Sequence, residues 1–298
     1  MTATPAPFGR LLTAMVTPFT TDGALDLDAA QRLATHLVDS GNDGLVVSGT
    51  TGESPTTSDT EKEQLLRAVL EAVGDRAVVV AGAGTNDTRH ALELARQAEK
   101  AGAHGLLLVS PYYNKPPQAG LIAHFRAIAD GTGLPVMLYD IPGRTGVEIA
   151  TESLVRLAEH DRIVAVKDAK CDVAGATEVL ARTDLVYYSG ADEYNLAWLA
   201  IGAVGAVSVV GHVAGREYAE MIRAVESGDL ARARELDRAL VPAFQAIMTR
   251  TQGAIMAKAA LELLGVLPGR TVRPPLVPAT EEQMRQLRVD LTEAGLTR

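Results

Sequence analysis

The sequence is poor in the features that mark secreted and membrane-spanning proteins. Its one cysteine, Cys171, excludes an intrachain disulfide and a zinc site built from cysteines, and suits a reducing compartment. No apolar stretch approaches the roughly 20 residues needed to span a bilayer. The N-terminal segment MTATPAPFGR lacks the cationic and apolar regions of a signal peptide. These absences predict a cytoplasmic protein that does not associate with membranes.

The chain also lacks an excess of basic residues. Its formal net charge is −9, and its acidic residues are spread along the sequence. Nucleic-acid binding needs a basic face that displaces phosphate counterions, so no nucleic-acid partner is expected. The six histidines show neither HxH nor HExxH spacing, and no metal site is predicted. With 47% hydrophobic and 22% charged residues in a chain of 298, the composition is that of a soluble globular protein.

What the sequence does contain is a series of short apolar runs rich in β-branched residues. The runs are apolar throughout and do not alternate, as expected of parallel strands that are covered on both faces. Between them lie amphipathic helical patterns such as 61–75 and 88–102, and Ser58 with Glu61 predicts a capping box at the start of the first. The eight predicted strands are 11–19, 44–49, 77–84, 105–111, 135–141, 163–169, 185–190 and 206–211.

Eight β-α units in about 220 residues predict an α/β fold, a (β/α)8 TIM barrel, rather than an open doubly wound sheet. An open sheet usually has a Gly-rich phosphate turn after its first strand, where this chain has TPFTTDG. Beyond residue 225 only helical patterns follow, at 227–240, 242–264 and 280–295. We therefore predict a catalytic barrel, residues 1–225, and a small C-terminal helical region, residues 226–298, with a role in packing or oligomer contacts.

The chemistry of such a barrel is expected at the C-terminal ends of its strands. Lysine, tyrosine, threonine and arginine gather in the segments that follow the predicted strands. These segments are GTTGES after the second strand, SPYYNKP after the fourth, YDIPGRTG after the fifth, KDAK after the sixth and SGAD after the seventh.

Lys167 stands out among the lysines at these ends. A lysine at a strand end usually serves solubility, but this one directly follows the apolar residues 164–166 and should point into the barrel mouth. Burial lowers the pKa of an amine, and a neutral amine can attack a carbonyl to form a Schiff base. Lys115 and Lys170 lie in loops beyond the strands, where water keeps their amines ordinary.

Three further groups each have a structural and a functional interpretation. Tyr139 is either a core filler or, because the fifth and sixth strands are neighbours, a proton shuttle close to Lys167. The GTTGES segment is either a tight turn or a nest in which Thr50 and Thr51 help to bind a carboxylate. Arg144 is either a surface arginine or a bidentate clamp on a second carboxylate.

Six segments, in this order and spacing, give the chain a resemblance to the dihydrodipicolinate synthase and N-acetylneuraminate lyase superfamily, and most of all to its synthases. The resemblance covers nearly the whole barrel, and six segments in register are far more specific than any one of them. The segments are GTTGES (49–54), AGAGTND (81–87), SPYYNKP (110–116), LYDIPGRTG (138–146), VKDAK (166–170) and YSGAD (188–192).

The resemblance implies catalytic roles for four residues. Lys167 would form the Schiff base with pyruvate. Tyr139, Thr51 and Tyr113 would form a proton relay, in which Tyr113 reaches into the active site of a neighbouring subunit. The minimal working unit would then be a dimer, and the family usually forms a homotetramer of two tight dimers.

The resemblance also implies binding roles and a reaction. Thr50 and Thr51 would hold the pyruvate carboxylate, Arg144 would receive the carboxylate of L-aspartate 4-semialdehyde, and Gly190 and Val207 would line the pocket. The enzyme would be a lyase that condenses the two substrates at the first committed step of diaminopimelate and lysine biosynthesis. No metal or organic cofactor is implied, because the covalent imine supplies the electron withdrawal.

Regulation is one point where the chain departs from part of this family. Members that L-lysine inhibits have a histidine at position 59 and a glutamate at position 90, whereas this chain has Asp59 and His90. Lys62 adds a charge of the same sign as the effector's ammonium group. Weak or absent inhibition by lysine is therefore predicted.

Two alternative functions stay open at the level of sequence. Another pyruvate-dependent aldolase of the superfamily, acting on sialic acid or a 2-keto-3-deoxy sugar acid, would share Lys167 and Tyr139. A catalytically silent barrel kept for binding would be expected to have lost Lys167, Tyr139 or Thr51, and all three are present.

Overall fold

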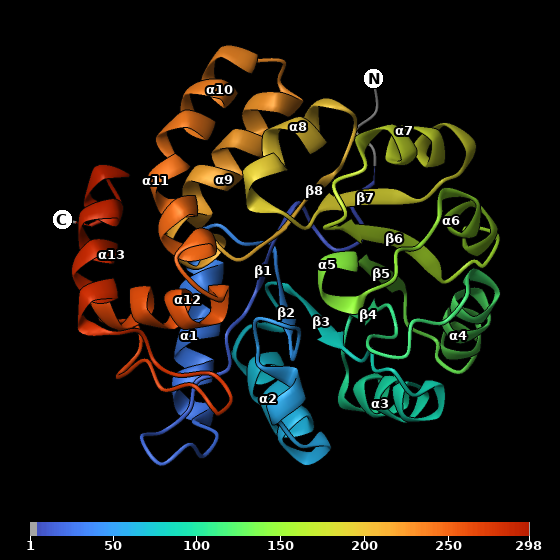
Figure 1. Cartoon of the computed structure of the whole chain (residues 1–298), viewed down its shortest axis with the longest axis horizontal. Helices are drawn as coiled ribbons and strands as arrows, with labels where there is room; N and C mark the ends of the chain where they lie inside the picture. Colours follow the sequence, from blue (N-terminus) through green and yellow to red (C-terminus); the bar gives the residue numbers. More distant parts are fainter. Residues whose placement is uncertain (1–4, 298) are drawn as a thin grey trace.

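The computed structural model describes residues 5–297 and forms a closed barrel of parallel strands (Figure 1). Consecutive strands pair with one another, and the first pairs with the last, which confirms the predicted (β/α)8 architecture. The strands are β1 (Leu11–Ala14), β2 (Gly44–Val47), β3 (Val78–Gly82), β4 (Gly105–Val109), β5 (Val136–Asp140), β6 (Ile163–Asp168), β7 (Val186–Ser189) and β8 (Gly205–Ser208).

Every predicted strand is present, and the largest error in length is at the first. The predicted run 11–19 gives a strand of only four residues, and 15–19 continue as an apolar loop. Phe19 in that loop is only 5% exposed. Apolar character therefore marked burial there, and it did not distinguish a strand from a buried loop.

Alternation along each strand divides the core in two. Residues such as Leu12, Met137 and Ala165 fill the barrel interior, whereas their neighbours Leu11, Leu138 and Val166 belong to the layer between the strands and the helices. Both faces of each strand are therefore buried, which explains the uniformly apolar sequence runs. Because successive side chains point to opposite faces, the inward position of Ala165 also places residue 167 toward the barrel axis.

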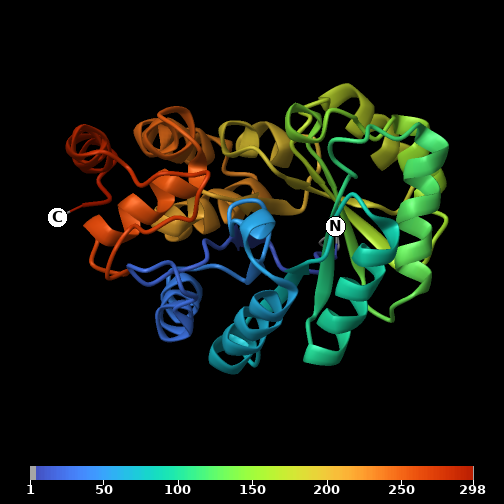
Figure 2. The ribbon, with the colours of Figure 1, turned by 60° about the horizontal axis from the view of Figure 1, so that its bottom comes forward.

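Helices surround the barrel (Figures 1 and 2). Ser58 and Glu61 form the predicted capping box at the start of α2. The helices up to α9 are α1 (Leu27–Asp39), α2 (Asp59–Val73), α3 (Thr88–Ala101), α4 (Gln118–Asp130), α5 (Pro142–Thr145), α6 (Thr151–Leu157), α7 (Val173–Arg182), α8 (Asn195–Ala200) and α9 (Gly211–Glu226), with short 3-10 turns at Ser54–Thr56 and Asp192–Tyr194. Of the helices in the described range, none has the length and apolar character that crossing a membrane requires.

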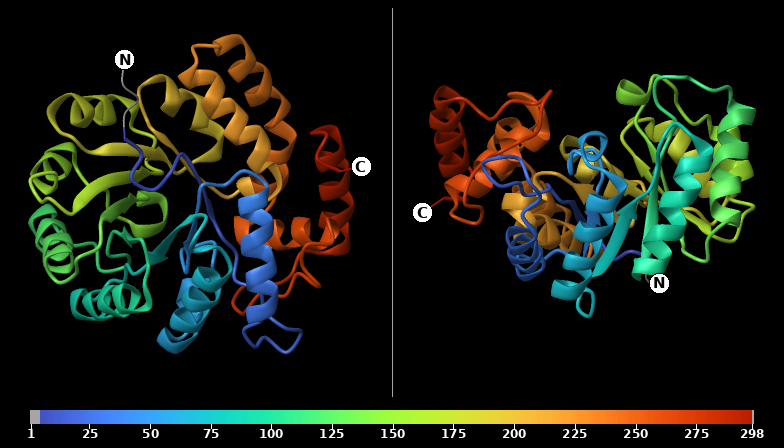
Figure 3. Two further views of the ribbon diagram at one scale, coloured as in Figure 1. Left: turned by 180° about the vertical axis from the view of Figure 1, so that it is seen from behind. Right: turned by 90° about the horizontal axis from the view of Figure 1, so that it is seen from below.

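The C-terminal region continues as α10 (Leu230–Ala239), α11 (Val241–Phe244), a π-helical turn (Gln245–Thr249), α12 (Gly253–Leu263) and α13 (Glu281–Glu293). The single predicted helix 242–264 is wrong, because Gln252 has extended backbone and its side chain accepts a hydrogen bond from the Ala254 N–H, which starts a new helix. Figure 3 shows α12 and α13 on the side of the barrel occupied by α1, away from α4 and α6. The domain division at residue 225 stays a prediction.

Candidate active site

Lys167 and Tyr139 lie side by side at the C-terminal ends of neighbouring strands. The register of β5 and β6 pairs the two residues directly, and Nζ of Lys167 lies 4.1 Å from the centroid of the Tyr139 ring. Lys167 is 4% exposed and Tyr139 is 5% exposed. The structure thus brings together the two side chains that strand adjacency placed near each other.

The lysines at this end of the fold differ in their partners. Lys170 lies 3.5 Å from the carboxylate of Asp140, and Lys258 lies 2.5 Å from that of Glu53. Within residues 5–297, by contrast, Lys167 forms no ion pair with a carboxylate. Burial lowers the pKa of Lys258 to about 8, but its ammonium is held by Glu53 and by the carbonyl oxygen of Thr271. Lys167, without a carboxylate in contact, is therefore the buried lysine better suited to act as a neutral amine.

The surroundings of Lys167 lower its pKa to about 8, chiefly because burial removes water from the ammonium group. The negative charge of Asp192 raises this pKa, and the positive charge of Arg144 lowers it. A depression from 10.5 to about 8 corresponds to a cost of about 3 kcal/mol for keeping the charged amine in the folded protein. That cost is present below pH 8 and disappears as the pH rises toward 10.5.

The pH dependence of the reaction should follow this amine. At pH 7 a pKa of about 8 leaves roughly 10% of the amine neutral, against about 0.03% for an unperturbed lysine. We expect kcat/KM for pyruvate to rise about tenfold per pH unit below 8 and to level off above it. A kcat/KM that keeps rising through pH 10 would contradict a perturbed nucleophile.

Tyr139 remains protonated throughout that range. Burial raises the pKa of its hydroxyl to about 12, while the charge of Arg144 and an interaction with the Thr50 side chain act in the opposite direction. The hydroxyl therefore keeps its proton at rest, and it can act as both donor and acceptor in a proton relay. From the GTTGES segment, Thr50 lines the same cavity as Tyr139; Thr51, which the resemblance placed in the relay, is not among the lining residues, and neither is Lys167.

A cavity of about 200 Å³ opens beside these residues and is large enough for a small keto acid. Arg144 lies on the short helix α5, which follows β5 directly, so the guanidinium belongs to the same wall as Tyr139. The lining residues are Ser48, Gly49, Thr50, Ser54, Pro55, Gly82, Gly84, Leu107, Val109, Tyr112, Tyr139, Ile141, Arg144 and Thr145.

Gly190 and Val207 lie on the β7 and β8 side of the barrel. A Cβ atom at Gly190 would lie 2.8 Å from the carbonyl oxygen of Asp168 and 3.0 Å from Cγ of Lys167, so the absence of a side chain leaves room for the lysine. Val207 is buried and points into the barrel interior with Ala165. Gly190 thus borders the base of Lys167, and both residues lie outside the lining of the open cavity.

Tyr113 is 90% exposed and has a left-handed backbone with φ of 73°. Within the described chain its neighbour Tyr112 lines the cavity, and Tyr113 does not. An outward tyrosine held in a strained conformation is unusual for a residue with no function.

Asp192 is a functional candidate to which sequence reasoning assigned no role, although it lies in the YSGAD segment. Its buried carboxylate accepts hydrogen bonds from the Ser208 hydroxyl and from the backbone N–H groups of Val209 and Val210. It also supplies the negative charge that raises the pKa of Lys167. The signal was present in the sequence, since an Asp follows the seventh strand end, but its partners lie on the next β-α unit.

Comparison with known proteins gives matches over nearly the whole chain. Residues 7–294 match the model of the dihydrodipicolinate synthetase family. The 4-hydroxy-tetrahydrodipicolinate synthase of Kineococcus radiotolerans is 70% identical over 290 residues, covering 97% of this chain and 94% of that protein. The enzyme of the same name from Acidothermus cellulolyticus is 69% identical over 293 residues, with 98% and 94% covered.

Solved structures agree in fold. A dihydrodipicolinate synthase from Bacillus anthracis superposes with a TM-score of 0.92 at 43% identity, covering 96% of this chain and 98% of that one. The enzyme from Cyanidioschyzon merolae, crystallised with lysine bound, gives a TM-score of 0.95 at 42% identity, with 98% and 100% covered. At 42 to 43% identity, the likeness to these synthases extends to the amino-acid sequence as well as to the barrel architecture.

Proposed function

The chain belongs to the dihydrodipicolinate synthetase family, and on that premise we propose that Lys167 forms a Schiff base with pyruvate and that the resulting enamine condenses with L-aspartate 4-semialdehyde. The activity is that of a 4-hydroxy-tetrahydrodipicolinate synthase, a lyase of lysine and diaminopimelate biosynthesis. The observation that carries the proposal is a buried lysine of lowered pKa, without a carboxylate in contact, against the ring of Tyr139.

The reaction runs through a covalent imine. The neutral amine of Lys167 adds to the ketone carbon of pyruvate, and the carbinolamine loses water to give a protonated imine. The imine withdraws electrons, so a methyl proton is lost and an enamine forms. The enamine carbon then adds to the aldehyde of the second substrate. The amino group of that substrate finally attacks the imine carbon and displaces Lys167, which closes the ring and regenerates the enzyme. The imine itself is the electron sink, so no metal or organic cofactor is required.

Proton transfer accompanies each of these steps. In this proposal the hydroxyl of Tyr139, whose ring centroid lies 4.1 Å from the amine, delivers a proton to the departing water and takes one back at cyclisation. Thr50 lines the cavity together with Tyr139, which supports a path for that proton from Tyr139 toward the mouth of the cavity. The relay role of Thr51 stays a prediction.

Replacing the two threonines separately tests which of them takes part. We expect Thr50→Val to lower kcat roughly tenfold to a hundredfold, because a hydroxyl is lost from the cavity wall that Thr50 shares with Tyr139. Thr51→Val should have the smaller effect on kcat. Steady-state kinetics of both variants measure the two effects. A larger fall of kcat in Thr51→Val than in Thr50→Val would favour the relay through Thr51.

Arg144 and the cavity lining support a second substrate with a carboxylate. The guanidinium lines the wall that also bears Tyr139, and it can form two parallel hydrogen bonds with a carboxylate. The alternative of a sugar-acid aldolase has no comparable support, since relatives at 54 to 70% identity are named as synthases. Measuring pyruvate consumption with L-aspartate 4-semialdehyde, against pyruvate release from sialic acid and 2-keto-3-deoxy sugar acids, tests the assignment.

The exposed Tyr113 supports assembly of the chain into a homo-oligomer. Its 90% exposure and strained backbone fit a side chain that enters the site of a neighbouring subunit, with a homotetramer of two dimers as the proposed state. In this proposal the relay is completed by the neighbour's tyrosine. A Tyr113→Phe protein that retains full kcat as an intact oligomer would contradict that role.

We expect L-lysine to inhibit this enzyme weakly or not at all. Nε2 of His90 contacts the Asp59 carboxylate at 2.9 Å, and the nearby Lys62 ammonium donates to the Thr57 carbonyl oxygen. An added lysine ammonium would meet a like charge without a free carboxylate. Initial rates over a range of lysine concentrations test this, and His90→Glu is the matched variant with increased sensitivity expected. Half-maximal inhibition below millimolar lysine in the parent protein would show the prediction to be wrong.

A further inference from the structure

The segment that carries Thr50 has strained backbone at two places. Ser48 has φ of 57° and Glu53 has φ of 55°, so two residues with side chains adopt the left-handed region on either side of Gly49–Gly52. Such conformations are costly for residues other than glycine and persist only where the surroundings enforce them.

The carboxylate of Glu53 provides the main contact, and it points away from the cavity into the protein. Oε1 accepts a hydrogen bond from Nζ of Lys258 at 2.5 Å, and Oε2 accepts one from the backbone N–H of Arg273 at 2.9 Å. The side chains of Glu53 and Lys258 are only 2% and 1% exposed. Both partners come from the C-terminal region, more than 200 residues further along the chain.

Several contacts besides Glu53 fix the position of the Lys258 side chain. It lies on α12, where residues 253–261 are all buried, and its ammonium also donates to the carbonyl oxygen of Thr271 at 2.7 Å. The same ammonium lies 4.2 Å from the centroid of the Phe19 ring. A buried ammonium is strongly unfavourable without a partner, so Lys258 and Glu53 fix each other in position.

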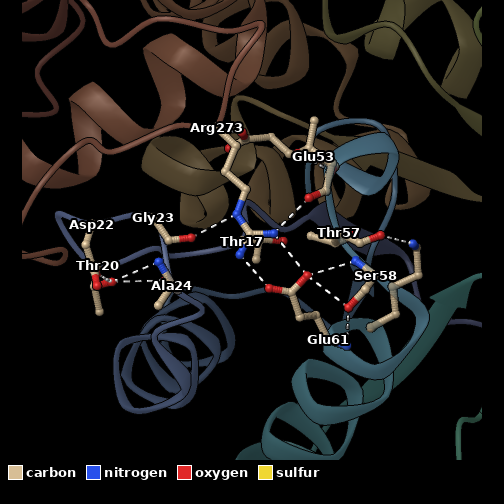
Figure 4. A network of polar contacts seen from close by, with 12 residues as sticks. Thr17, Thr20, Asp22, Gly23, Ala24, Glu53, Thr57, Ser58, Glu61 and Arg273 are labelled. Carbon is tan, nitrogen blue, oxygen red and sulfur yellow. Dashed lines mark hydrogen bonds and ion pairs between the residues drawn. The ribbon is translucent and has the colours of Figure 1, made fainter.

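Arg273 ties the end of the same segment to the start of α2 (Figure 4). Its guanidinium donates to the carbonyl oxygens of Gly23 and Thr56 at 2.9 and 2.7 Å, and it forms two hydrogen bonds with the Glu61 carboxylate. A guanidinium that donates to two carbonyl oxygens and a carboxylate has few alternative positions.

The C-terminal region also reaches the mouth of the active site. A second cavity of about 210 Å³ adjoins the first and shares Thr50, Pro55 and Arg144 with it. Gln252, Pro275 and Leu276 of the C-terminal region form its other wall, beside Glu53 and Thr56. The segment 49–56 is therefore enclosed between the barrel and the C-terminal region.

We propose that Lys258, together with the backbone N–H of Arg273, is a positioning group that acts through Glu53 to hold Thr50 in the cavity wall it shares with Tyr139. This inference rests on the proposed function, because it assigns the C-terminal region a role in the proton relay of that reaction. It gives this region a task in catalysis in addition to the predicted packing or oligomer contacts. Neither Lys258 nor Arg273 touches the substrate cavity beside Lys167.

Glu53→Gln is the first test. The carboxylate accepts from donors on both oxygens, so an amide would direct its own N–H₂ group at one of them. We expect kcat to fall between about 10-fold and 100-fold, as displacement of a positioned group by about 1 Å does. Trapping of the pyruvate imine with borohydride should proceed nearly as in the parent protein, because Lys167 lies on β6 and Glu53 lies in the segment that follows β2.

Lys258→Met and the double variant Glu53→Gln/Lys258→Met separate positioning from stability. Either single change leaves one group of the buried pair unsatisfied, whereas the double change removes the unpaired charge. The double variant should recover much of the thermal stability but keep kcat reduced at least about fivefold. If the pair were merely structural, stability and kcat would recover together, and the proposal would be overturned.

Asp290→Asn is the matched control for breaking an ion pair in the same region. Asp290 on α13 pairs with Arg250 at 2.6 Å, away from the segment 49–56. It should lower thermal stability and leave kcat unchanged. An equal fall of kcat in this control would also overturn the proposal. Failure of the parent protein to form a pyruvate imine would refute the proposed function itself, whereas normal trapping together with parental kcat in Glu53→Gln would refute only the positioning role.

Discussion

We expect the Lys167→Met variant to be folded, inactive and more stable than the parent protein. Without the amine no imine can form, and turnover should fall at least about a thousandfold. The methionine stem fills the space of the lysine without an ionised group. The protein should therefore recover up to about 3 kcal/mol of unfolding free energy at pH 7, the cost that follows from a pKa near 8.

The sign of the pH effect gives this prediction a second test. The folded pKa of Lys167 lies below its unfolded value, so the unfolded chain binds more protons and the parent protein gains stability as the pH rises from 8 to 10.5. The advantage of the methionine variant should be greatest below pH 8 and should shrink above it. Denaturant unfolding at pH 7 and pH 10, with turnover measured in parallel, checks both parts. A variant that keeps a tenth of the parental turnover would exclude Lys167 as the nucleophile.

Tyr139→Phe should lower kcat by about a hundredfold to a thousandfold with little loss of stability. The ring stays in place and only the hydroxyl is removed, so packing within the barrel is preserved. Imine formation should become slower but should still go to completion, since the nucleophile is intact.

The measurements for Tyr139→Phe are steady-state kcat and the time course of borohydride trapping. Tyr187→Phe is the matched control, because Tyr187 is also buried but packs in the outer core against Trp198. Near-parental turnover of the Tyr139 variant would remove the hydroxyl from the mechanism.

The barrel and the closeness of Lys167 and Tyr139 could be predicted from the sequence, because both follow from the pattern and order of the strands. Uniform apolar runs identified the strands, and their order placed the fifth beside the sixth. The same order brought Tyr139 next to Lys167, since parallel neighbours end at the same edge. The break at Gln252 was missed, because an apolar helical pattern continues on both sides of it.

The remaining features depend on backbone conformation and on contacts across the chain. Thr50 and Thr51 are adjacent and chemically alike, so the sequence alone does not show that Thr50 lines the cavity with Tyr139 and that Thr51 lies outside the lining. The pair between Glu53 and Lys258 joins positions 205 residues apart. No periodicity or spacing in the sequence predicts that contact.

The mass of the protein after treatment with pyruvate and borohydride tests the imine at Lys167 most directly. We predict a gain of about 72 Da, pyruvate less water plus two hydrogens, on a single peptide that contains Lys167. An unchanged mass under conditions where the enzyme turns over, or an adduct on Lys170 or Lys258 in place of Lys167, would contradict the account.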